Sequence, residues 1–270
     1  MTAADIRVRP VKFEFPEQID VMAMPGDIAG SAGMVGFSFT LPYLEPYLIR
    51  TMTIAKGHTK DPDLLADMRA FSKQEGHHFK NHKRINELVK TQLPDWCAEE
   101  LSDIEQQLND DYQRFTKDKS LRWNLAYAEG FEAMTFAMAQ NSFENREVEL
   151  AEDRMEQNWS DLYEWHLAEE IEHRNVAYDA YYKIYGGYFY RLVVGVRAQA
   201  HFLNYVGRFA KVVAKGLREQ GRAPETETQS QGGLTLPPQY WRTLSPWYNP
   251  SNIDISETIQ DLLKKWDMAY

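Results

Sequence analysis

Cysteine is nearly absent from this sequence of 270 residues. Cys97 is the only one, so no disulfide can form within the chain, and we expect a reducing compartment. The sequence also lacks any stretch of about 18 uncharged apolar residues, which a membrane-spanning helix would require. Residues 1–20 lack the basic-then-apolar pattern of a secretory signal peptide. These absences predict a cytoplasmic protein without a transmembrane segment.

Dense clusters of lysine and arginine are missing as well. The net charge is −10 at pH 7, and no basic stretch offers the footprint that nucleic acid needs. We find no Ser/His/Asp arrangement and no phosphate-binding loop. A β-strand pattern occurs only in the N-terminal arm, I-R-V-R-P-V-K-F-E-F. Hydrophobic residues make up 43% of the chain, which is enough for a substantial core. The predicted fold class is all-α.

Apolar residues recur at intervals of three and four along most of the chain, and this spacing predicts helices. Residues 1–33 form an arm that ends in a glycine-rich turn region at Pro25–Gly33. Proline, glycine and capping residues delimit the elements that follow. We predict helices over Met34–Lys56, Asp61–Val89, Trp96–Phe115, Lys119–Gln140, Trp159–Tyr185 and Tyr188–Glu219.

The C-terminal part reads as a long helix, a linker and a tail. The predicted apolar stripe of the long helix is Leu192, Val193, Val196, Ala200, Leu203 and Val206. Residues 220–236 are rich in Gly, Gln, Thr and Pro, which predicts a flexible surface linker. An aromatic tail then leads to a helix capped at Asp254 or Ser256. We expect residues 1–220 to form one helical domain with its arm, and residues 221–270 to pack on it.

The helix predicted from Trp159 carries histidines and a glutamate on an otherwise apolar stripe. His166, Glu170 and His173 lie between Leu162 and Ala177 at helical spacing. A carboxylate buried among apolar residues must be paired or bind a metal. The alternative is a solvated acidic face made by Glu164, Glu169, Glu170 and Glu172.

The helix predicted over Asp61–Val89 repeats this pattern. Glu75, His78 and His82 interrupt an apolar stripe at its middle. Glu75-x-x-His78 and Glu170-x-x-His173 are pairs by which one helix offers two ligands to one metal. Two further helices each add a candidate glutamate: Glu45 on the helix predicted over Met34–Lys56, and Glu132 on the helix predicted over Lys119–Gln140.

The order Glu, Glu-x-x-His, Glu, Glu-x-x-His on four helices is the ligand set of di-iron and di-manganese proteins with a ferritin-like bundle. We therefore predict a ferritin-like four-helix bundle with an extra crossover helix, Trp96–Phe115, and additional C-terminal helices. The predicted metal ligands are Glu45, Glu75, His78, Glu132, His166, Glu170 and His173.

Several neighbouring residues remain open. His82 is either a ligand or part of the cavity wall, and we expect it on the same side of the metals as His166. Glu129 is a rival or companion of Glu132. Pro46 disfavours helical geometry at Glu45, which could instead cap a helix. Glu169 and Glu172 either orient the ligands or are surface charges, and His77 points away from the stripe.

Five segments resemble the bacterial family described as predicted metal-dependent hydrolases: I-R-V-R-P-V-K-F-E-F, P-Y-L-E, F-S-K-Q-E-G-H-H-F-K-N-H, F-E-A-M-T and W-H-L-A-E-E-I-E-H-R-N-V-A-Y-D. The resemblance covers most of residues 5–200 and implies a ferritin-like fold, whereas "hydrolase" in that name is itself a prediction. The spacing H-x-x-x-E-x-x-H is also similar to that of di-iron aminoarene N-oxygenases, whose extra histidine adds a seventh ligand. His166 stands at the matching position.

Carboxylate-rich sites with a few histidines suit Fe(II) or Mn(II), and Zn(II) fits this donor set less well. The first functional hypothesis is an oxidase or oxygenase with two Fe ions that uses O2 on an unidentified small-molecule substrate. The second is a dinuclear metal-dependent hydrolase. The third is metal storage or sensing without catalysis. A homodimer is compatible with the sequence.

Overall fold

Helices dominate the computed structural model, which describes residues 6–144, 155–222 and 236–269. No strand occurs in these ranges, and the all-α prediction is confirmed. No described helix is long and apolar enough to cross a membrane. The α-helices are α1 (Ile28–Ala55), α2 (Pro62–Gln92), α3 (Asp95–Asp118), α4 (Leu121–Glu144), α6 (Gln157–His173), α7 (Val176–Ile184), α8 (Tyr188–Glu219), α9 (Pro238–Thr243) and α10 (Glu257–Ala269).

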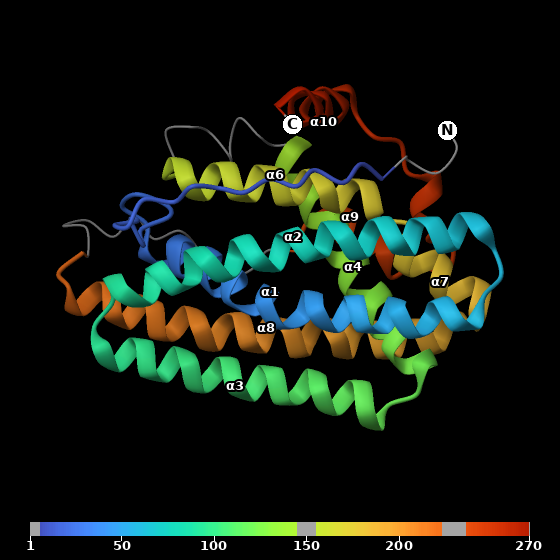
Figure 1. Ribbon diagram of the computed structural model, residues 1–270, viewed down its shortest axis with the longest axis horizontal. Coiled ribbons are helices and arrows are strands. Elements are labelled where there is room, and N and C mark those ends of the chain that lie inside the picture. Colours follow the sequence, from blue (N-terminus) through green and yellow to red (C-terminus); the bar gives the residue numbers. More distant parts are fainter. Residues whose placement is uncertain (1–5, 145–154, 223–235, 270) are drawn as a thin grey trace.

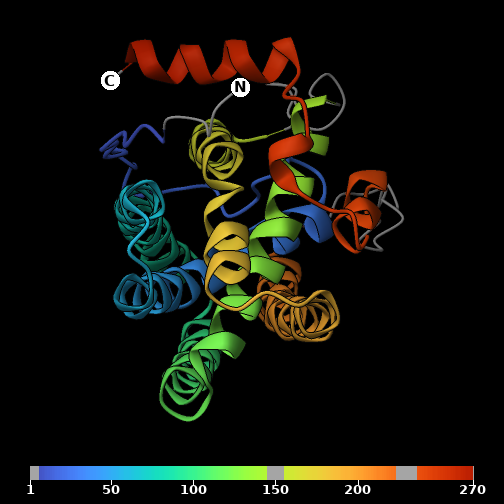
Figure 2. The same cartoon turned by 90° about the vertical axis from the view of Figure 1, so that its right-hand side faces the viewer.

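The long helices α1, α2, α3 and α8 lie side by side along the molecule, with α6 above them (Figure 1). As expected of a crossover, α3 carries the chain back along the bundle after α2. In Figure 2, α4 rises through the molecule and packs against α8 and α6. The short α10 lies across the top, over α6. Each of the helices α1, α2, α4 and α6 turns one face toward the interior of the molecule.

The first helix begins earlier than predicted. Asp27 caps it, because its Oδ1 accepts a hydrogen bond from the Gly30 N–H at 2.9 Å. Gly26 supplies the preceding turn with a φ of 79°, a value that favours glycine. The predicted glycine-rich turn region is therefore wrong from Ile28 onward, where the chain is already helical.

Pro42 and Pro46 lie inside α1. A proline has no N–H for the carbonyl four residues earlier, which for Pro42 is that of Ser38. Asn86 of α2 replaces the missing donor, since its Nδ2 lies 2.9 Å from the Ser38 carbonyl oxygen. The helix continues through this point, so Glu45 is a buried interior residue. The alternative that Glu45 caps a helix is wrong.

The predicted helix Trp159–Tyr185 is two helices. α6 ends at His173 and α7 begins at Val176, with a turn at Arg174 and Asn175. In a continuous helix the Asn175 N–H would donate to the carbonyl of Ile171. The Arg174 guanidinium donates to that carbonyl instead, at 2.5 Å. The predicted end of this region at Tyr185 agrees with the structure, because Gly186 and Gly187 follow with φ values of 71° and 106°, which favour glycine.

α8 has the predicted bounds, but it buries another face. Of the predicted apolar stripe, Val193 and Val196 are 51% and 44% exposed, and Ala200 is also exposed. A close approach to α4 sets the rotation of the helix, because a side chain on Gly130 would collide with the Gly195 backbone. The stripe prediction is wrong in this respect. The buried face consists of Arg191, Val194, Gly195, Ala198, Gln199, Phe202, Tyr205, Phe209, Val212, Val213, Gly216 and Leu217.

Side chains cap the starts of α2 and α10, and the cap predicted for the tail helix is confirmed. Asp61 Oδ1 accepts hydrogen bonds from the N–H groups of Asp63 and Leu64 at the start of α2. Ser256 Oγ accepts from the Ile259 N–H at 3.4 Å where α10 begins. Residues 223–235 of the predicted linker and residues 145–154 of the connection before α6 lie outside the described residues.

Candidate metal centre

Seven side chains from four helices converge in the interior of the bundle, and none is more than 2% exposed. Helical spacing brings them together, because residues three and four apart lie on one face. α1 and α4 each contribute a glutamate, α2 a glutamate and a histidine, and α6 a glutamate and two histidines. They are the residues expected from the sequence: Glu45, Glu75, His78, Glu132, His166, Glu170 and His173.

The alternative of a solvated acidic face on α6 is wrong. Its four glutamates are at most 6% exposed: Glu164, Glu169, Glu170 and Glu172. An ionised carboxylate is costly to bury unless it pairs with a cation, accepts hydrogen bonds or binds a metal. The surroundings of each buried carboxylate therefore indicate its role.

The donor atoms form two groups that share one histidine. The first group has donor atoms within 4.8 Å of one another from Glu75, His78, Glu170 and His173. The second meets the same criterion with Glu45, His78 and His166. Glu132 adjoins the first group, since its Oε2 lies 3.1 Å from His173 Nδ1. Two adjacent groups of carboxylate and imidazole donors can hold two metal ions.

Many of these donor atoms have no hydrogen-bond partner among the described residues. They are both carboxylate oxygens of Glu45, Glu75 and Glu132, Nδ1 of His78, and both ring nitrogens of His173. Buried polar atoms in proteins nearly always have a partner. Here they face one another instead: Glu75 Oε1 and Glu170 Oε1 each lie 3.6 Å from a ring nitrogen of His173. A cluster of unpartnered buried donors fits bound cations.

Burial and mutual repulsion shift the pKa values of the clustered carboxylates. Burial raises the pKa of Glu45 well above its usual value, and the nearby carboxylates of Glu75 and Glu170 add to the effect. Burial also raises the pKa of Glu132 to about 8, with Glu170 adding to the rise and His173 opposing it. Burial acts upward on the pKa of Glu170 too, but His173 outweighs it and lowers that pKa to about 2. Without cations, the site cannot keep all its carboxylates ionised.

Two of the histidines hold protons. Burial lowers the pKa of His78, but its hydrogen bond with Glu169 outweighs burial and raises the pKa to about 10. Burial likewise opposes charge on His173, yet Glu170 and Glu132 raise its pKa to about 9. Both imidazoles are therefore protonated at neutral pH unless a metal displaces the protons.

A hydrogen-bond chain starts at Asn86 and fixes the protonation of His82. The Asn86 amide nitrogen donates to the Ser38 carbonyl, so its Oδ1 is the acceptor for Ser38 Oγ at 2.6 Å. Ser38 Oγ in turn accepts from His82 Nδ1 at 2.9 Å. Burial and the neighbouring His166 lower the pKa of His82 well below its usual value. His82 is thus neutral, with a lone pair on Nε2.

The same chain continues to His166. His82 Nε2 lies 2.8 Å from His166 Nδ1 and can only accept, so His166 carries its proton on Nδ1. Burial and the nearby His78 lower the pKa of His166, which leaves a lone pair on its Nε2. That nitrogen lies 2.9 Å from Glu170 Oε1 and 3.9 Å from Glu45 Oε1. A lone pair that faces carboxylate oxygens is the arrangement of ligands around one cation.

A family model described as "Predicted metal-dependent hydrolase" matches residues 7–254, which is most of the chain. The chain belongs to this family. Searches of curated proteins and of solved structures gave no match. The family's description and the buried carboxylate–histidine cluster agree on a metal-dependent protein.

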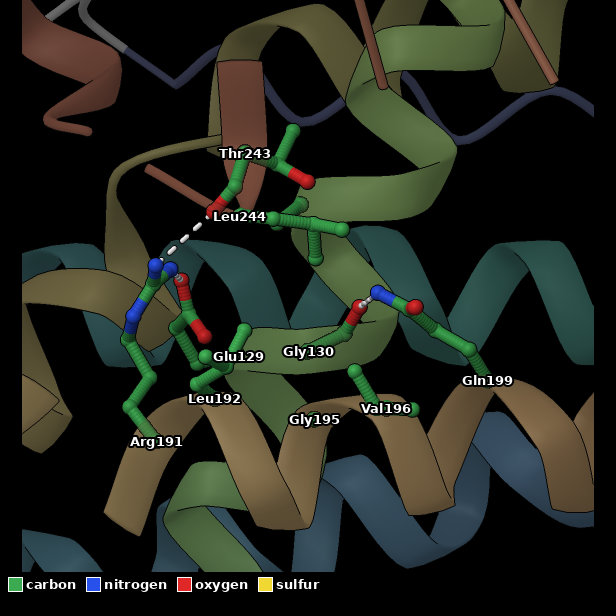
Figure 3. Close-up of a pocket in the computed structure, with 10 residues that line it drawn as sticks. Glu129, Gly130, Arg191, Leu192, Gly195, Val196, Gln199, Thr243 and Leu244 are labelled. Carbon is green, nitrogen blue, oxygen red and sulfur yellow. Dashed lines mark hydrogen bonds and ion pairs between the residues drawn. The ribbon is translucent and has the colours of Figure 1, made fainter. Parts of the chain in front are cut away.

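Glu129 is not among the clustered donor atoms, because it pairs with a cation on α8. Its Oε1 lies 2.6 Å from Arg191 Nη1, and Arg191 Nη2 donates to the Thr243 carbonyl at 2.8 Å (Figure 3). Glu129 and Arg191 are only 2% and 3% exposed. This carboxylate is already neutralised by a buried cation. Between Glu129 and Glu132, it is Glu132 that reaches the cluster.

Glu169 and Glu172 have different partners. Glu169 Oε2 lies 2.9 Å from His78 Nε2, which leaves Nδ1 of that ring to face the cluster. Glu172 binds the N-terminal arm, with 2.7 Å between its Oε1 and Arg9 Nη2. Arg9 also reaches Asp267 of α10 at 2.6 Å and lies 3.5 Å from Glu169. The arm, α6 and α10 are thereby tied to the residues around the site.

Sequence reasoning did not identify Ser38, Asn86, Thr135 or Arg9. Thr135 Oγ1 donates to Glu170 Oε2 at 2.7 Å. Its position on the inner stripe of α4, one turn after Glu132, was a usable signal. No pattern in the sequence pointed to Arg9, because the residues that it contacts lie more than 150 positions away in the chain.

Proposed function

We propose that the protein is a non-haem dinuclear metalloenzyme on a ferritin-like bundle formed by residues 1–220, with residues 221–270 packed on it. It holds two Fe ions, or Mn in their place, and uses O2 as an oxidase or oxygenase on a small-molecule substrate. The observation that carries the proposal is the set of buried, unpartnered donor atoms in two adjoining groups. The proposed ligands are Glu45, Glu75, His78, Glu132, His166, Glu170 and His173.

The donor set supports this choice of metal. Carboxylates with a few imidazoles suit Fe(II) and Mn(II) better than the softer ions that prefer thiolates, and the only cysteine, Cys97, is not among these residues. Four glutamates balance the charge of two divalent ions, which removes the mutual repulsion among the buried carboxylates. When bound, two such ions supply either two-electron reduction of O2 or, in the alternative function, a Lewis acid that activates water for hydrolysis.

The surrounding side chains keep water out and fix the ligands. The ring of Phe71 lies 4.9 Å from that of His173, and the ring of Trp165 lies 4.9 Å from that of His78. Glu169 holds the far nitrogen of His78, and His82 holds that of His166. Hydrogen bonds of this kind orient metal ligands and set their tautomers.

The alternative is a dinuclear hydrolase, and the family description favours it. Hydrolytic dinuclear sites more often use aspartate and histidine on loops, whereas the present set lies on helices. We therefore place redox chemistry first. A metal-binding protein without catalysis is the remaining possibility.

The deciding experiment is anaerobic loading with Fe(II), elemental analysis, and then exposure to O2. We expect about two Fe per chain, rapid O2 consumption, and new near-ultraviolet or visible absorption as Fe(II) is oxidised. Glu129→Gln is the matched control, because its carboxylate pairs with Arg191 outside the cluster.

A chain that takes one zinc ion, ignores O2 and cleaves nitrophenyl esters or phosphates would contradict the proposal and favour the hydrolase. Tight binding of two ions without O2 consumption or hydrolysis would favour metal binding alone.

A further inference from the structure

Exposed apolar side chains gather in one region of the surface. Among the described residues, seven large apolar side chains are more than 40% exposed, and six of them belong to the end of α7, the first half of α8, and the segment from α9 to residue 248. Phe189 and Trp247 are 79% and 87% exposed. The six residues, which we call the outer patch, are Tyr185, Phe189, Val193, Val196, Trp241 and Trp247.

The patch is built on two segments that are fixed to each other. Phe189, Val193 and Val196 follow one another at intervals of four and three along α8 and share its solvent side. The segment after α9 packs beside them: Tyr188 Oη donates to the Leu244 carbonyl at 2.8 Å. Figure 2 shows α8 and α9 on the same side of the molecule. Figure 3 shows Val196 and Leu244 around one shallow pocket.

The patch is bordered by cations in a protein whose net charge is −10. Between Asp179 and Glu219 the sequence has no acidic residue, and between residues 236 and 253 it has none either. The exposed cations beside or continuing the patch are Arg197, Lys211, Arg218 and Arg242.

Three acidic groups of α3 and α4, which pack beside α8, already have partners of their own. Glu129 of α4 is buried against Arg191. Asp111 of α3 accepts hydrogen bonds from Tyr205 and lies 3.1 Å from His201. Glu144, at the end of α4, accepts from Gln140 and Gln239. From Tyr188 to Arg218 the charged side chains of α8 itself are all basic, and the exposed ones among them therefore face solvent without an acidic neighbour on the same helix.

The apolar side chains and cations of the outer patch favour one kind of binding partner over another. A symmetric contact with a second copy would place the same patch on both sides, and so would set its cations against one another. The surface of an anionic membrane has the complementary charge. Tryptophan and phenylalanine insert at the level of the lipid headgroups, and lysine and arginine beside them attract anionic lipids.

We propose that the outer patch binds peripherally to membranes that contain anionic lipids. The aromatic side chains of Phe189, Trp241 and Trp247 enter the headgroup layer, and the cations of α8 contact lipid phosphates. α8 then lies along the membrane with its buried face still packed on α1 and α4.

The test is sedimentation of the full chain with vesicles of phosphatidylcholine, with and without phosphatidylglycerol, at low and high salt. We expect binding to the anionic vesicles, weakened by salt. Phe189→Ser with Trp247→Ser should lower the affinity by more than about tenfold. Arg197→Gln with Lys211→Gln should lower it by roughly tenfold for the anionic vesicles. All four positions are exposed, so the variants should fold.

Matched controls are Ile54→Ser and Lys80→Gln with Lys83→Gln on α2. Among the described residues, Ile54 is the large apolar side chain outside the patch with comparable exposure. Both controls should bind as the wild type does. The proposal is overturned if the wild type binds neither kind of vesicle, or if the controls lose binding equally. It is also overturned if light scattering detects a dimer that Phe189→Ser with Trp247→Ser dissociates while vesicle binding is absent.

Discussion

His82 Nε2 lies 2.8 Å from His166 Nδ1, and this contact determines which nitrogen of His166 faces the carboxylates. The two imidazoles lie on α2 and α6, 84 residues apart in sequence. Their contact agrees with the expectation that they share one side of the site. It also gives His82 a role that helical spacing alone left open: it is the hydrogen-bond acceptor that keeps His166 Nε2 unprotonated.

Loss of that acceptor should weaken metal binding. His82→Phe leaves the His166 N–H without a partner and frees the ring to change tautomer, so we expect about 10- to 100-fold lower metal affinity. Competition with a chelator measures this. His82→Gln keeps an acceptor and should restore most of the affinity. Equal affinity in the wild type and His82→Phe would show that the hydrogen bond does not orient a ligand.

Glu129 and Glu132 of α4 should behave differently when they are substituted. Glu132→Gln removes an anionic donor that lies 3.1 Å from His173 Nδ1, and we expect loss of at least one metal per chain. Glu129→Gln leaves the cluster intact and should retain both metals, although it weakens the contact with Arg191. Elemental analysis of both variants, with circular dichroism to verify folding, makes the comparison. Metal loss in Glu129→Gln but not in Glu132→Gln would show that Glu129, and not Glu132, is the ligand.

Metal affinity should rise with pH. Without metal, the pKa values of His78, His173 and Glu132 are about 10, about 9 and about 8, so protons occupy these groups at neutral pH. A metal must displace them, and proton release becomes easier as pH rises from about 6 to about 8. Calorimetry in two buffers of different ionisation enthalpy counts the released protons. Binding without proton release would contradict the protonation pattern.

Arg9 should stabilise the fold from the arm. Its guanidinium is 4% exposed and contacts both Glu172 and Asp267. Arg9→Met leaves buried carboxylates without their cation, so we expect the free energy of unfolding to fall by about 3–5 kcal/mol. Arg7→Met is the control: Arg7 pairs with Asp267 but is 63% exposed, and its loss should cost at most about 1 kcal/mol. Urea denaturation that ranks the two variants equally would contradict this role.

Short-range patterns in the sequence predicted much of the candidate site. Glu75 and His78, and likewise Glu170 and His173, share a helix face because of their spacing, whatever the rest of the fold does. Their place among apolar residues predicted burial. The family follows from the same segments and is confirmed by the match over residues 7–254. That the bundle is ferritin-like, and that two ions bind, stay predictions.

Only the tertiary structure decided the questions that depend on residues far apart in the chain. Spacing left Glu129 as a rival or companion of Glu132. The structure pairs Glu129 with Arg191, which lies 62 residues further along the chain, and so leaves Glu132 at the cluster. Pro42 is compatible with α1 because Asn86 caps the carbonyl that it leaves free. α8 has apolar residues on two faces, and its close approach to Gly130 selected the one that is buried. The sequence determined which helices form and which donors each one carries, because those depend on neighbours three and four residues away. Packing decided which faces meet and which donors remain without partners.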